Sequence, residues 1–448
     1  MKVAFTTLGC RTNQHDTAEM ATLLEEEGYS IVGAREPADV YVINTCTVTQ
    51  KSDRQSRQAV KKSLAINDQA LVVFTGCYAQ MNPEDALNLP GMDLVLGNAD
   101  KLEIAAAIKN RMARNGDGSA RLHMTDITRK REFRTIPVAE FHGKTKAFIK
   151  VQTGCDEKCS FCTVVHARGK SISESRQNIL HNIRRSVDSG FKEITLTGIN
   201  LGTYGRDKSE PETFSSLVEE ILKLAGAFRV RLSSINPMEI DDRLIDLMAE
   251  NEKLCPHLHI PLQSGDDHIL KRMRRNYDTR QYQDVVQRAV EKVPNLGLGA
   301  DIIVGFPGET DAMFENTRAM VEKLPYSYLH VFTYSARPKT EAEGFHNDVP
   351  DKIKKERNRV LTELGKKKSV QFRKQFIGRT LNLLVETQRD KTTGQLKGHS
   401  ENYIPVQIHG GDSLAGDGRP AGDGRLENRI VPVTVTEVTE TRATGCLP

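Results

Sequence analysis

The segment GCDEKCSFC (154–162) places three cysteines at a C-x₃-C-x₂-C spacing. Thiolates this close together suit a soft metal ion better than a disulfide framework. A structural zinc ion takes four ligands in a closed tetrahedron, and only His166 lies near enough in the sequence to be the fourth. An iron–sulfur cube contains four irons, so three cysteines would leave one iron open to a small molecule. The ligand count therefore favours an iron–sulfur cluster with an open position, and zinc is the alternative.

Three more cysteines, Cys10, Cys46 and Cys77, each end a run of apolar or β-branched residues: VAFTTLGC, VYVINTC and LVVFTGC. Such runs are typical of buried parallel strands. Helical stretches at 16–27 and 52–65 separate them, which gives a βαβαβ order and predicts an open parallel sheet. Because parallel strands end at one edge of a sheet, cysteines 36 and 31 positions apart could converge there on a shared ligand. The alternative is that each is a small buried thiol.

The composition is that of a globular protein of several domains. The chain has 448 residues, a formal net charge of +4 and eight cysteines, which in a reducing compartment are metal ligands or catalysts more often than disulfides. No apolar run approaches the ~18 residues that a membrane helix needs, and the first residues read as a strand rather than a signal peptide. We expect a cytoplasmic protein without a membrane partner. Cys255 and Cys446 fit neither pattern, and we predict a buried thiol and a tail residue.

Repeated strand–helix units follow the first tricysteine segment and predict a βα barrel or a doubly wound sheet. Polar loops follow the strands, and such loops hold the active site of a βα barrel. The cysteines at 155–162 lie after the first of these strands. The strand-like runs are 147–151, 193–197, 229–233, 257–262, 299–304 and 329–333, and the helical runs include 174–188, 213–225, 241–250, 279–292 and 311–323.

The C-terminal region combines a basic helix with short strands. Residues 351–374 carry ten Lys or Arg against three Asp or Glu, a net charge of +7. The runs LNLLVE, GHSENYIPVQI and RIVPVTVTEV predict a small β-barrel, and small barrels of this kind bind oligonucleotides. The alternative for the helix is an ordinary solvated face. Between the strands, AGDGRPAGDGR (415–425) predicts a flexible loop.

The whole chain resembles the radical S-adenosylmethionine methylthiotransferases, through the tricysteine loop with Phe161 before its last cysteine, the dispersed cysteine triad and the C-terminal strands. The resemblance implies an α/β protein with an N-terminal open parallel sheet, a partial (βα)₆ radical barrel and a small all-β barrel like the RNA-binding TRAM domain. The corresponding domains are an N-terminal methylthiotransferase domain (1–115), a linker (116–145), a radical core (146–371) and a TRAM-like barrel (372–448).

The resemblance also implies the cofactors, which are two 4Fe–4S clusters and S-adenosylmethionine. In this family the open iron of the radical cluster holds the methionine part of S-adenosylmethionine, whose cleavage gives a 5′-deoxyadenosyl radical, and the second cluster supplies or carries sulfur. The positions matching the clusters are Cys155, Cys159 and Cys162 for the radical cluster and Cys10, Cys46 and Cys77 for the second. Candidate residues around S-adenosylmethionine are Phe161, Gly198 and Asn200 in ITLTGIN, Ser233 and Ser234 in RLSSINP, Gln263 in HLHIPLQSG, Arg274 in RMRRNY, and Ile303 and Gly305 in DIIVGFPGET.

Within the family, ARGKSISESR (167–176) and HIPLQSG (259–265) look most like the branch that acts on N6-threonylcarbamoyladenosine beside the tRNA anticodon. Isopentenyladenosine in tRNA and an Asp of a ribosomal protein are the alternative substrates. The implied partners are the tRNA anticodon loop and a reductant such as flavodoxin or ferredoxin, and the sequence names no sulfur donor. One departure from the family pattern is Lys339 and Glu341 in YSARPKTEAEGF (334–345).

Two different functions stay open on the residues alone. One is a non-catalytic RNA-binding module that holds a structural metal. The other is a radical enzyme that uses the second cluster only for electron transfer.

Overall fold

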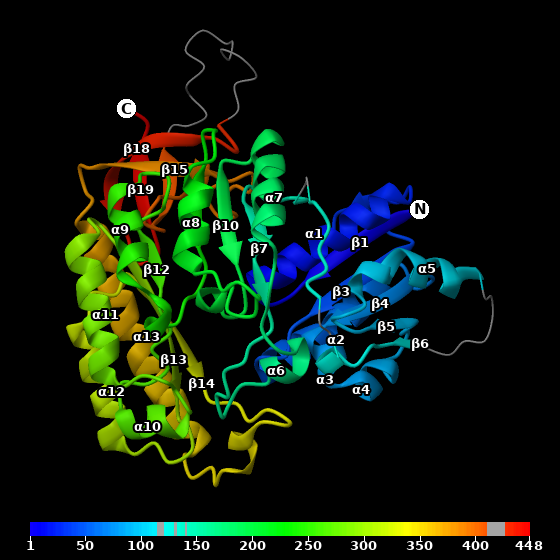
Figure 1. The fold of residues 1–448 in the computed structure, drawn as a ribbon, viewed down its shortest axis with the longest axis horizontal. Coiled ribbons are helices and arrows are strands. Elements are labelled where there is room, and N and C mark those ends of the chain that lie inside the picture. Colours follow the sequence, from blue (N-terminus) through cyan, green and yellow to red (C-terminus); the bar gives the residue numbers. More distant parts are fainter. Residues whose placement is uncertain (114–120, 130–131, 139–140, 410–425) are drawn as a thin grey trace.

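The computed structural model describes residues 1–113, 121–129, 132–138, 141–409 and 426–448, and its first unit is a six-stranded parallel sheet (Figure 1). The strands are ordered β2-β1-β3-β4-β5-β6, and helices pack on both faces. Every residue of β3, VYVINT, is buried, as expected for a strand covered on both sides. The strands are β1 (Lys2–Thr7), β2 (Ser30–Val32), β3 (Val40–Thr45), β4 (Leu71–Gly76), β5 (Leu94–Leu96) and β6 (Arg121–His123). The helices are α1 (Arg11–Glu26), α2 (Gln50–Leu64), α3 (Cys77–Met81), α4 (Pro83–Leu87), η1 (Lys101–Glu103), α5 (Ile104–Ala113) and η2 (Ile127–Arg129).

Helix α1 begins at Arg11, five residues before the helix expected at 16–27. The polar residues RTNQH are helical because the neighbouring loops satisfy their side chains. The Asn13 amide donates to the carbonyls of Leu8 and Thr45, at 2.7 and 2.9 Å. Strand β6 lies within the segment predicted as a linker and extends the first sheet.

Six further parallel strands form the partial barrel. Strands β7, β10 and β11 pair in one sheet and β12, β13 and β14 in another, and parallel bridges from Val230 to Leu254 and from Ser234 to His259 join the two. The strands are β7 (Ala147–Lys150), β10 (Glu193–Thr197), β11 (Arg229–Leu232), β12 (His257–His259), β13 (Gly297–Val304) and β14 (Tyr328–Thr333), with a small ribbon of β8 (Gln152–Thr153) and β9 (Ile172–Ser173). The helices are α6 (Val164–Arg168), α7 (Arg176–Asp188), η3 (Leu201–Thr203), α8 (Phe214–Leu222), η4 (Pro237–Glu239), α9 (Asp242–Glu250), α10 (Asp267–Arg272), α11 (Thr279–Lys292), α12 (Asp311–Lys323) and η5 (Glu341–Gly344).

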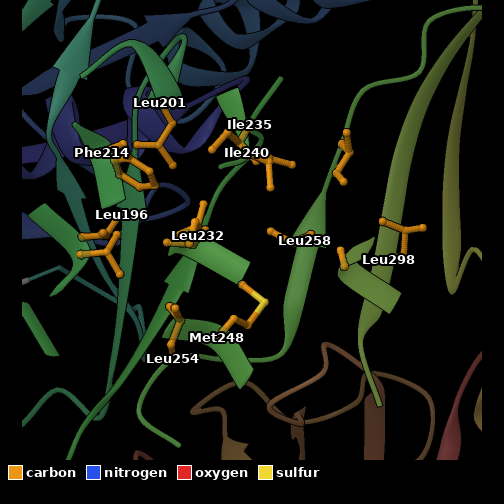
Figure 2. Packing of buried hydrophobic residues seen from close by; sticks show 14 of the residues in the cluster. Leu196, Leu201, Phe214, Leu232, Ile235, Ile240, Met248, Leu254, Leu258 and Leu298 are labelled. Atoms are coloured by element: carbon orange, nitrogen blue, oxygen red, sulfur yellow. The ribbon is translucent and has the colours of Figure 1, made fainter. Parts of the chain in front are cut away.

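One hydrophobic core holds the partial barrel together. Figure 2 shows Leu196, Leu232, Leu258 and Leu298, which come from four successive strands and belong to one buried cluster. Met248 of α9 packs into the same cluster from the surrounding helices. Each such side chain contributes roughly 1.5–3 kcal/mol on burial, so the strand ends and their loops stand on a rigid base.

The C-terminal strands close into a five-stranded barrel ordered β15-β16-β17-β19-β18, which together with the two sheet systems confirms the expected fold class. The long basic helix α13 (Asp351–Lys374) leads into it, and Phe372 near the helix end packs on the barrel core. Cys446 is the last residue of β19, so it lies in a strand rather than in a loose tail. The AGDGR repeat at 415–425 lies outside the described residues. The strands are β15 (Thr380–Val385), β16 (Lys397–His399), β17 (Pro405–His409), β18 (Ile430–Val438) and β19 (Ala443–Cys446).

No helix in the described part of the chain is both long and apolar enough to cross a bilayer.

Candidate functional site

The loop cysteines follow β8 at the carboxyl end of the first barrel strand. Gly154, which precedes Cys155, has φ +72°, and a Cβ there would lie 1.8 Å from the carbonyl oxygen of Lys170. Only glycine fits this approach. The Cys155 amide donates to the Gly169 carbonyl at 3.1 Å, which fixes the start of the loop against the segment that follows it.

Two of the loop thiols, those of Cys155 and Cys162, are protonated in the metal-free chain at neutral pH. Burial, together with the charges of the neighbouring cysteines, raises the pKa of Cys155 to about 12 and that of Cys162 to about 11. A bound metal group removes these protons, because the thiolate is the ligand.

The spacing of the thiols favours a large metal group over a single small ion. A tetrahedral zinc ion with ligands at ~2.3 Å needs sulfur atoms under roughly 4 Å apart. Among the described residues, His259, Asp301 and His330 are the only three His, Cys, Asp or Glu residues that bring ligand atoms within 4.8 Å of one another. Neither cysteine triplet is therefore closed around one ion, and His166 is exposed on α6. The donor set and its openness fit an iron–sulfur cluster.

Arg275 contacts the loop site directly. Its Nη1 donates to Sγ of Cys159 at 3.0 Å, its Nη2 donates to Asn236 at 2.5 Å, and its Nε donates to the Tyr277 hydroxyl at 3.2 Å. Tyr277 in turn donates to the carbonyl of Pro261. The guanidinium is thus held in place as a charge partner for the Cys159 thiolate.

Arg274, the candidate from the sequence, does not face the cysteines. It is half-exposed and pairs with Glu341 at 2.7 Å. Helix α10 ends in a Schellman turn, in which the Arg275 amide bonds the Leu270 carbonyl and Arg274 takes φ +55°. This turn sends residue 274 outward and residue 275 back toward the cluster loop.

The N-terminal cysteines meet at the carboxyl ends of β1, β3 and β4, as the sequence predicts. Gly9 has φ +88°, and a Cβ there would lie 2.7 Å from Cβ of Cys46 and 2.9 Å from its Sγ, so the Cys10 loop lies directly on Cys46. Burial raises the pKa of Cys46 to about 11, with Cys77 and Cys10 adding to the effect. Cys46 and Cys77 are buried, and Cys10 is exposed.

The two cysteine sites face each other across the contact of α3 with α6. Cys77, Met81 and Ala167 form one buried apolar cluster, and Thr163 Oγ1 donates to the Met81 sulfur at 3.4 Å. The charge of Cys77 also contributes to raising the pKa of Cys162. A group held by either triplet would therefore lie beside the other.

Of the candidates around S-adenosylmethionine, Gly198 and Asn200 follow β10 and are ordered by Gln152, which the sequence did not single out. Oε1 of Gln152 accepts from the amides of Ile199 and Asn200, each at 2.9 Å. The Asn200 side chain donates to Glu239 at 3.1 Å and accepts from Asn236 at 3.0 Å. A polar chain thus runs from Cys159 through Arg275 and Asn236 to Asn200.

The other candidates are spread around the barrel mouth. Ser233 is buried, and its hydroxyl has no hydrogen-bond partner among the described residues, whereas Ser234 is exposed. Phe161 packs edge-on against Phe306, and the Gly305 amide donates to Glu309 at 2.7 Å.

A cavity of about 190 Å³ lies beside the loop cysteine Cys162, between the barrel mouth and the segment that follows Cys46. Asp301, which lines it, lies 3.0 Å from His259 and 3.1 Å from His330. The exposed Phe332 and Val48 flank it from the barrel and from the N-terminal unit. Its lining also includes Phe161, Cys162, Gln263 and Ile303.

Helix α13 divides its basic residues between packing and solvent. Arg357 is buried and pairs with Glu309 and Asp311, and Arg373 is buried against the carbonyls of Thr439 and Glu440. The exposed basic residues are Lys352, Lys355, Arg359, Lys366, Lys367 and Lys374. Helix α13 therefore presents a basic face to solvent, but with six exposed basic residues rather than all ten in the sequence.

Comparison with known proteins assigns the two cysteine triplets to two different family models. A family model described as the uncharacterized protein family UPF0004 matches residues 2–97, and the radical SAM superfamily model matches residues 149–321. The first range contains the N-terminal cysteines and the second contains the loop cysteines.

Curated relatives cover nearly the whole chain. The threonylcarbamoyladenosine tRNA methylthiotransferase MtaB of Aquifex aeolicus is 40% identical over 410 residues, 92% of this chain and 97% of the relative. The tRNA-2-methylthio-N(6)-dimethylallyladenosine synthase of Protochlamydia amoebophila is 34% identical over 413 residues, 92% of this chain and 91% of the relative. The solved structure of the radical S-adenosylmethionine methyltransferase TsrM from Kitasatospora setae shares the fold, with a TM-score of 0.55 at 15% identity, over 76% of this chain and 73% of that one.

Proposed function

This chain belongs to the radical S-adenosylmethionine methylthiotransferases, and from that membership we propose that it transfers a methylthio group to C2 of N6-threonylcarbamoyladenosine beside the anticodon of tRNA. The observation that carries the proposal is the meeting of two open cysteine triplets in a chain that is 40% identical to a threonylcarbamoyladenosine tRNA methylthiotransferase. Methylthiolation of dimethylallyl (isopentenyl) adenosine is the second candidate, favoured by the relative at 34% identity.

The cofactors are two 4Fe–4S clusters and S-adenosylmethionine. Cys155, Cys159 and Cys162 would hold one cluster, and the N-terminal triplet Cys10, Cys46 and Cys77 would hold the other. When bound, the first supplies the electron that cleaves S-adenosylmethionine to a carbon radical, and the second supplies or carries the sulfur. The protein's own contribution is to space the six thiols and to hold the two triplets on either side of the contact between α3 and α6.

Several side chains would position S-adenosylmethionine at the barrel mouth. Gln152 fixes the backbone after β10, and Asn200 is held between Asn236 and Glu239. The resulting amides and carboxylate suit the charged methionine part of the molecule. Further positions proposed for this cofactor are Phe161, Gly198, Ser233, Ser234, Gln263, Ile303 and Gly305.

The C-terminal barrel and helix α13 would bind the tRNA. The proposal rests on the exposed basic side chains of α13, which can contact phosphates, beside a five-stranded barrel of the kind that binds oligonucleotides. A tRNA substrate would be met in the cytoplasm, which is the location proposed for the protein, and its electrons would come from a carrier such as flavodoxin or ferredoxin. The corresponding domain limits are 1–115, 146–371 and 372–448, although α13 itself continues to Lys374.

Nucleoside mass spectrometry of tRNA from a deletion strain tests the function. We expect N6-threonylcarbamoyladenosine to accumulate without its 2-methylthio derivative, and the plasmid-borne gene to restore it. Loss of the methylthio group from isopentenyladenosine instead would identify the second candidate. Anaerobic iron and sulfide analysis of the protein separates an enzyme with two cubes, at roughly eight irons per chain, from an RNA-binding module with structural zinc.

A further inference from the structure

A five-residue helix connects the two cysteine sites. Helix α6 starts two residues after Cys162 and ends at Arg168. The carbonyl of Ala167 accepts from the Asn98 amide at 2.7 Å, and the same amide lies 3.8 Å from Sγ of Cys77. The segment that leaves the radical loop therefore packs directly on the loop of the third N-terminal cysteine.

Arg168 reaches the other two N-terminal loops through Asn13. Its Nη2 donates to Oδ1 of Asn13 at 2.5 Å. The Asn13 amide donates to the carbonyls of Leu8 and Thr45, which lie one or two residues before the first and second N-terminal cysteines. One side chain of the barrel unit thus braces the loops that follow two strands, β1 and β3, of another sheet.

Arg168 also belongs to a buried charge network. Its Nη2 donates to Asp16 at 2.9 Å, and Asp16 accepts from Lys101 at 2.7 Å and from Lys150 at 2.9 Å. Lys150 also pairs with Glu19 at 2.6 Å. The five side chains are all at most 8% exposed, and together they line a void of about 30 Å³, room for about one water molecule.

The network carries more positive than negative charge beside the N-terminal cysteines. Three cations, Arg168, Lys101 and Lys150, face two carboxylates. Burying an unmatched cation is costly unless an anion lies close by. Burial lowers the pKa of Arg168, but Asp16 and the thiols of Cys77 and Cys10 raise it beyond that loss. The thiolates are thus the natural counter-charge for the surplus cation.

We propose that Arg168 is a positioning residue for the N-terminal cluster, bracing the loops of its first two ligands, Cys10 and Cys46, and raising its reduction potential with a buried positive charge. The inference rests on the proposed function, because it requires a cluster at that triplet. A nearby cation stabilises the more negative, reduced state of a cluster and so makes reduction easier. The barrel unit therefore sets the electronic state of a group held by the other unit.

The test isolates the N-terminal cluster. The parent is the Cys155→Ala, Cys159→Ala, Cys162→Ala triple variant of the full chain, reconstituted with iron and sulfide and titrated by redox potentiometry with EPR detection. Arg168→Gln, Arg168→Lys and the control Arg184→Gln, which removes an exposed charge on α7, are each placed in this parent. Thermal melting of each variant reports whether the fold is kept.

We expect about four irons per chain in the parent. Arg168→Gln should lower the reduced-to-oxidised ratio at a given potential by roughly tenfold, which for one electron is about 59 mV. Arg168→Lys should lie near the parent because it keeps the charge, and Arg184→Gln should match the parent. If Arg168→Gln cannot be folded, the Lys variant carries the test, since a potential as low as that expected for Gln would overturn the role of charge.

Iron in the parent together with an unchanged potential in Arg168→Gln would overturn this inference alone. A parent without iron would overturn the proposed second cluster and this inference with it.

Discussion

The two cysteine triplets proposed to hold the iron–sulfur clusters are built by opposite means. The loop triplet comes from nine consecutive residues, held by Gly154 and by one guanidinium, that of Arg275. The N-terminal triplet comes from three strand ends, and two of its loops are joined by Asn13 and braced by Arg168 from another unit. The first site is local and stands open at the barrel mouth, whereas the second depends on the register of a sheet and on a contact between units. The comparison teaches that loss of a ligand should act locally in both sites, but loss of a supporting residue should spread further in the second.

The largest effect is expected for Cys159→Ala. It removes a thiolate from the local site, so the metal group there should be lost, and both 5′-deoxyadenosine and methylthio-nucleoside should fall below detection. Iron should drop from roughly eight to roughly four per chain, because the N-terminal triplet does not share this ligand. Quantifying both products by mass spectrometry checks the prediction. Formation of 5′-deoxyadenosine at the normal rate would show that the radical cluster lies elsewhere.

Cys46→Ala tests the N-terminal triplet, because it removes one of that site's three proposed ligands. Methylthiolation should be lost while S-adenosylmethionine is still cleaved, because the loop triplet keeps all three ligands. The paired assay of 5′-deoxyadenosine and methylthio-nucleoside from one preparation separates the two sites. Normal methylthiolation in this variant would mean that the N-terminal cysteines are only buried thiols.

Acid should first destabilise the buried charge network beside the N-terminal triplet. Burial raises the pKa of Glu19, but Lys150 and His15 lower it to about 2 overall, from an ordinary value of 4.5. Its carboxylate therefore stabilises the fold above pH 4.5, and this contribution disappears as the pH falls toward 2. We expect a loss of about 2 kcal/mol by pH 3 from this residue.

Urea denaturation of the metal-free protein at pH 6 and pH 3, followed by circular dichroism, measures the loss. Glu19→Gln should be less stable at pH 6 and should show a smaller drop between the two pH values. An equal drop in the variant and the wild type would assign the acid sensitivity to other carboxylates.

The smallest effect is expected for Arg275→Gln. The side chain loses its charge beside Cys159 but leaves all three ligands, so iron content should stay at the wild-type value. Cleavage of S-adenosylmethionine should slow by about tenfold, since one charge-assisted contact is worth roughly 1.5–3 kcal/mol and glutamine keeps part of it. Arg280→Gln, on the exposed face of α11, is the matched control. A cleavage rate equal to that of the Arg280→Gln control would show that the Arg275 charge has no role in the reaction at the loop site.

The sequence predicts the two groups of cysteines because each of the six proposed ligands lies in a local pattern. The six barrel strands and the C-terminal barrel are likewise readable from short apolar runs. The sequence does not predict the start of α1 because RTNQH looks too polar for a helix, and partners such as the Thr45 and Phe148 carbonyls come from distant parts of the chain.

Supporting residues could not be found in the same way. Arg168 and Asp16 are 152 positions apart, so no local pattern joins them. The one-residue difference between Arg274, the candidate from the sequence, and Arg275, which contacts Cys159, has a different origin. It depends on a left-handed turn at a non-glycine residue, for which the sequence carries no glycine signal.

The interlocked charges of α1, β7 and α6 limit how this enzyme can be divided or recombined. A fragment ending at Ala113 would keep Asp16 and Glu19 but lose Lys150 and Arg168, leaving two carboxylates without most of their partners. The N-terminal unit is therefore not a portable module, even though a separate family model matches it. In a chimaera of two relatives, all of these side chains would have to come from the same parent. The crossover would therefore be placed after α6 rather than in the segment between the two sheets.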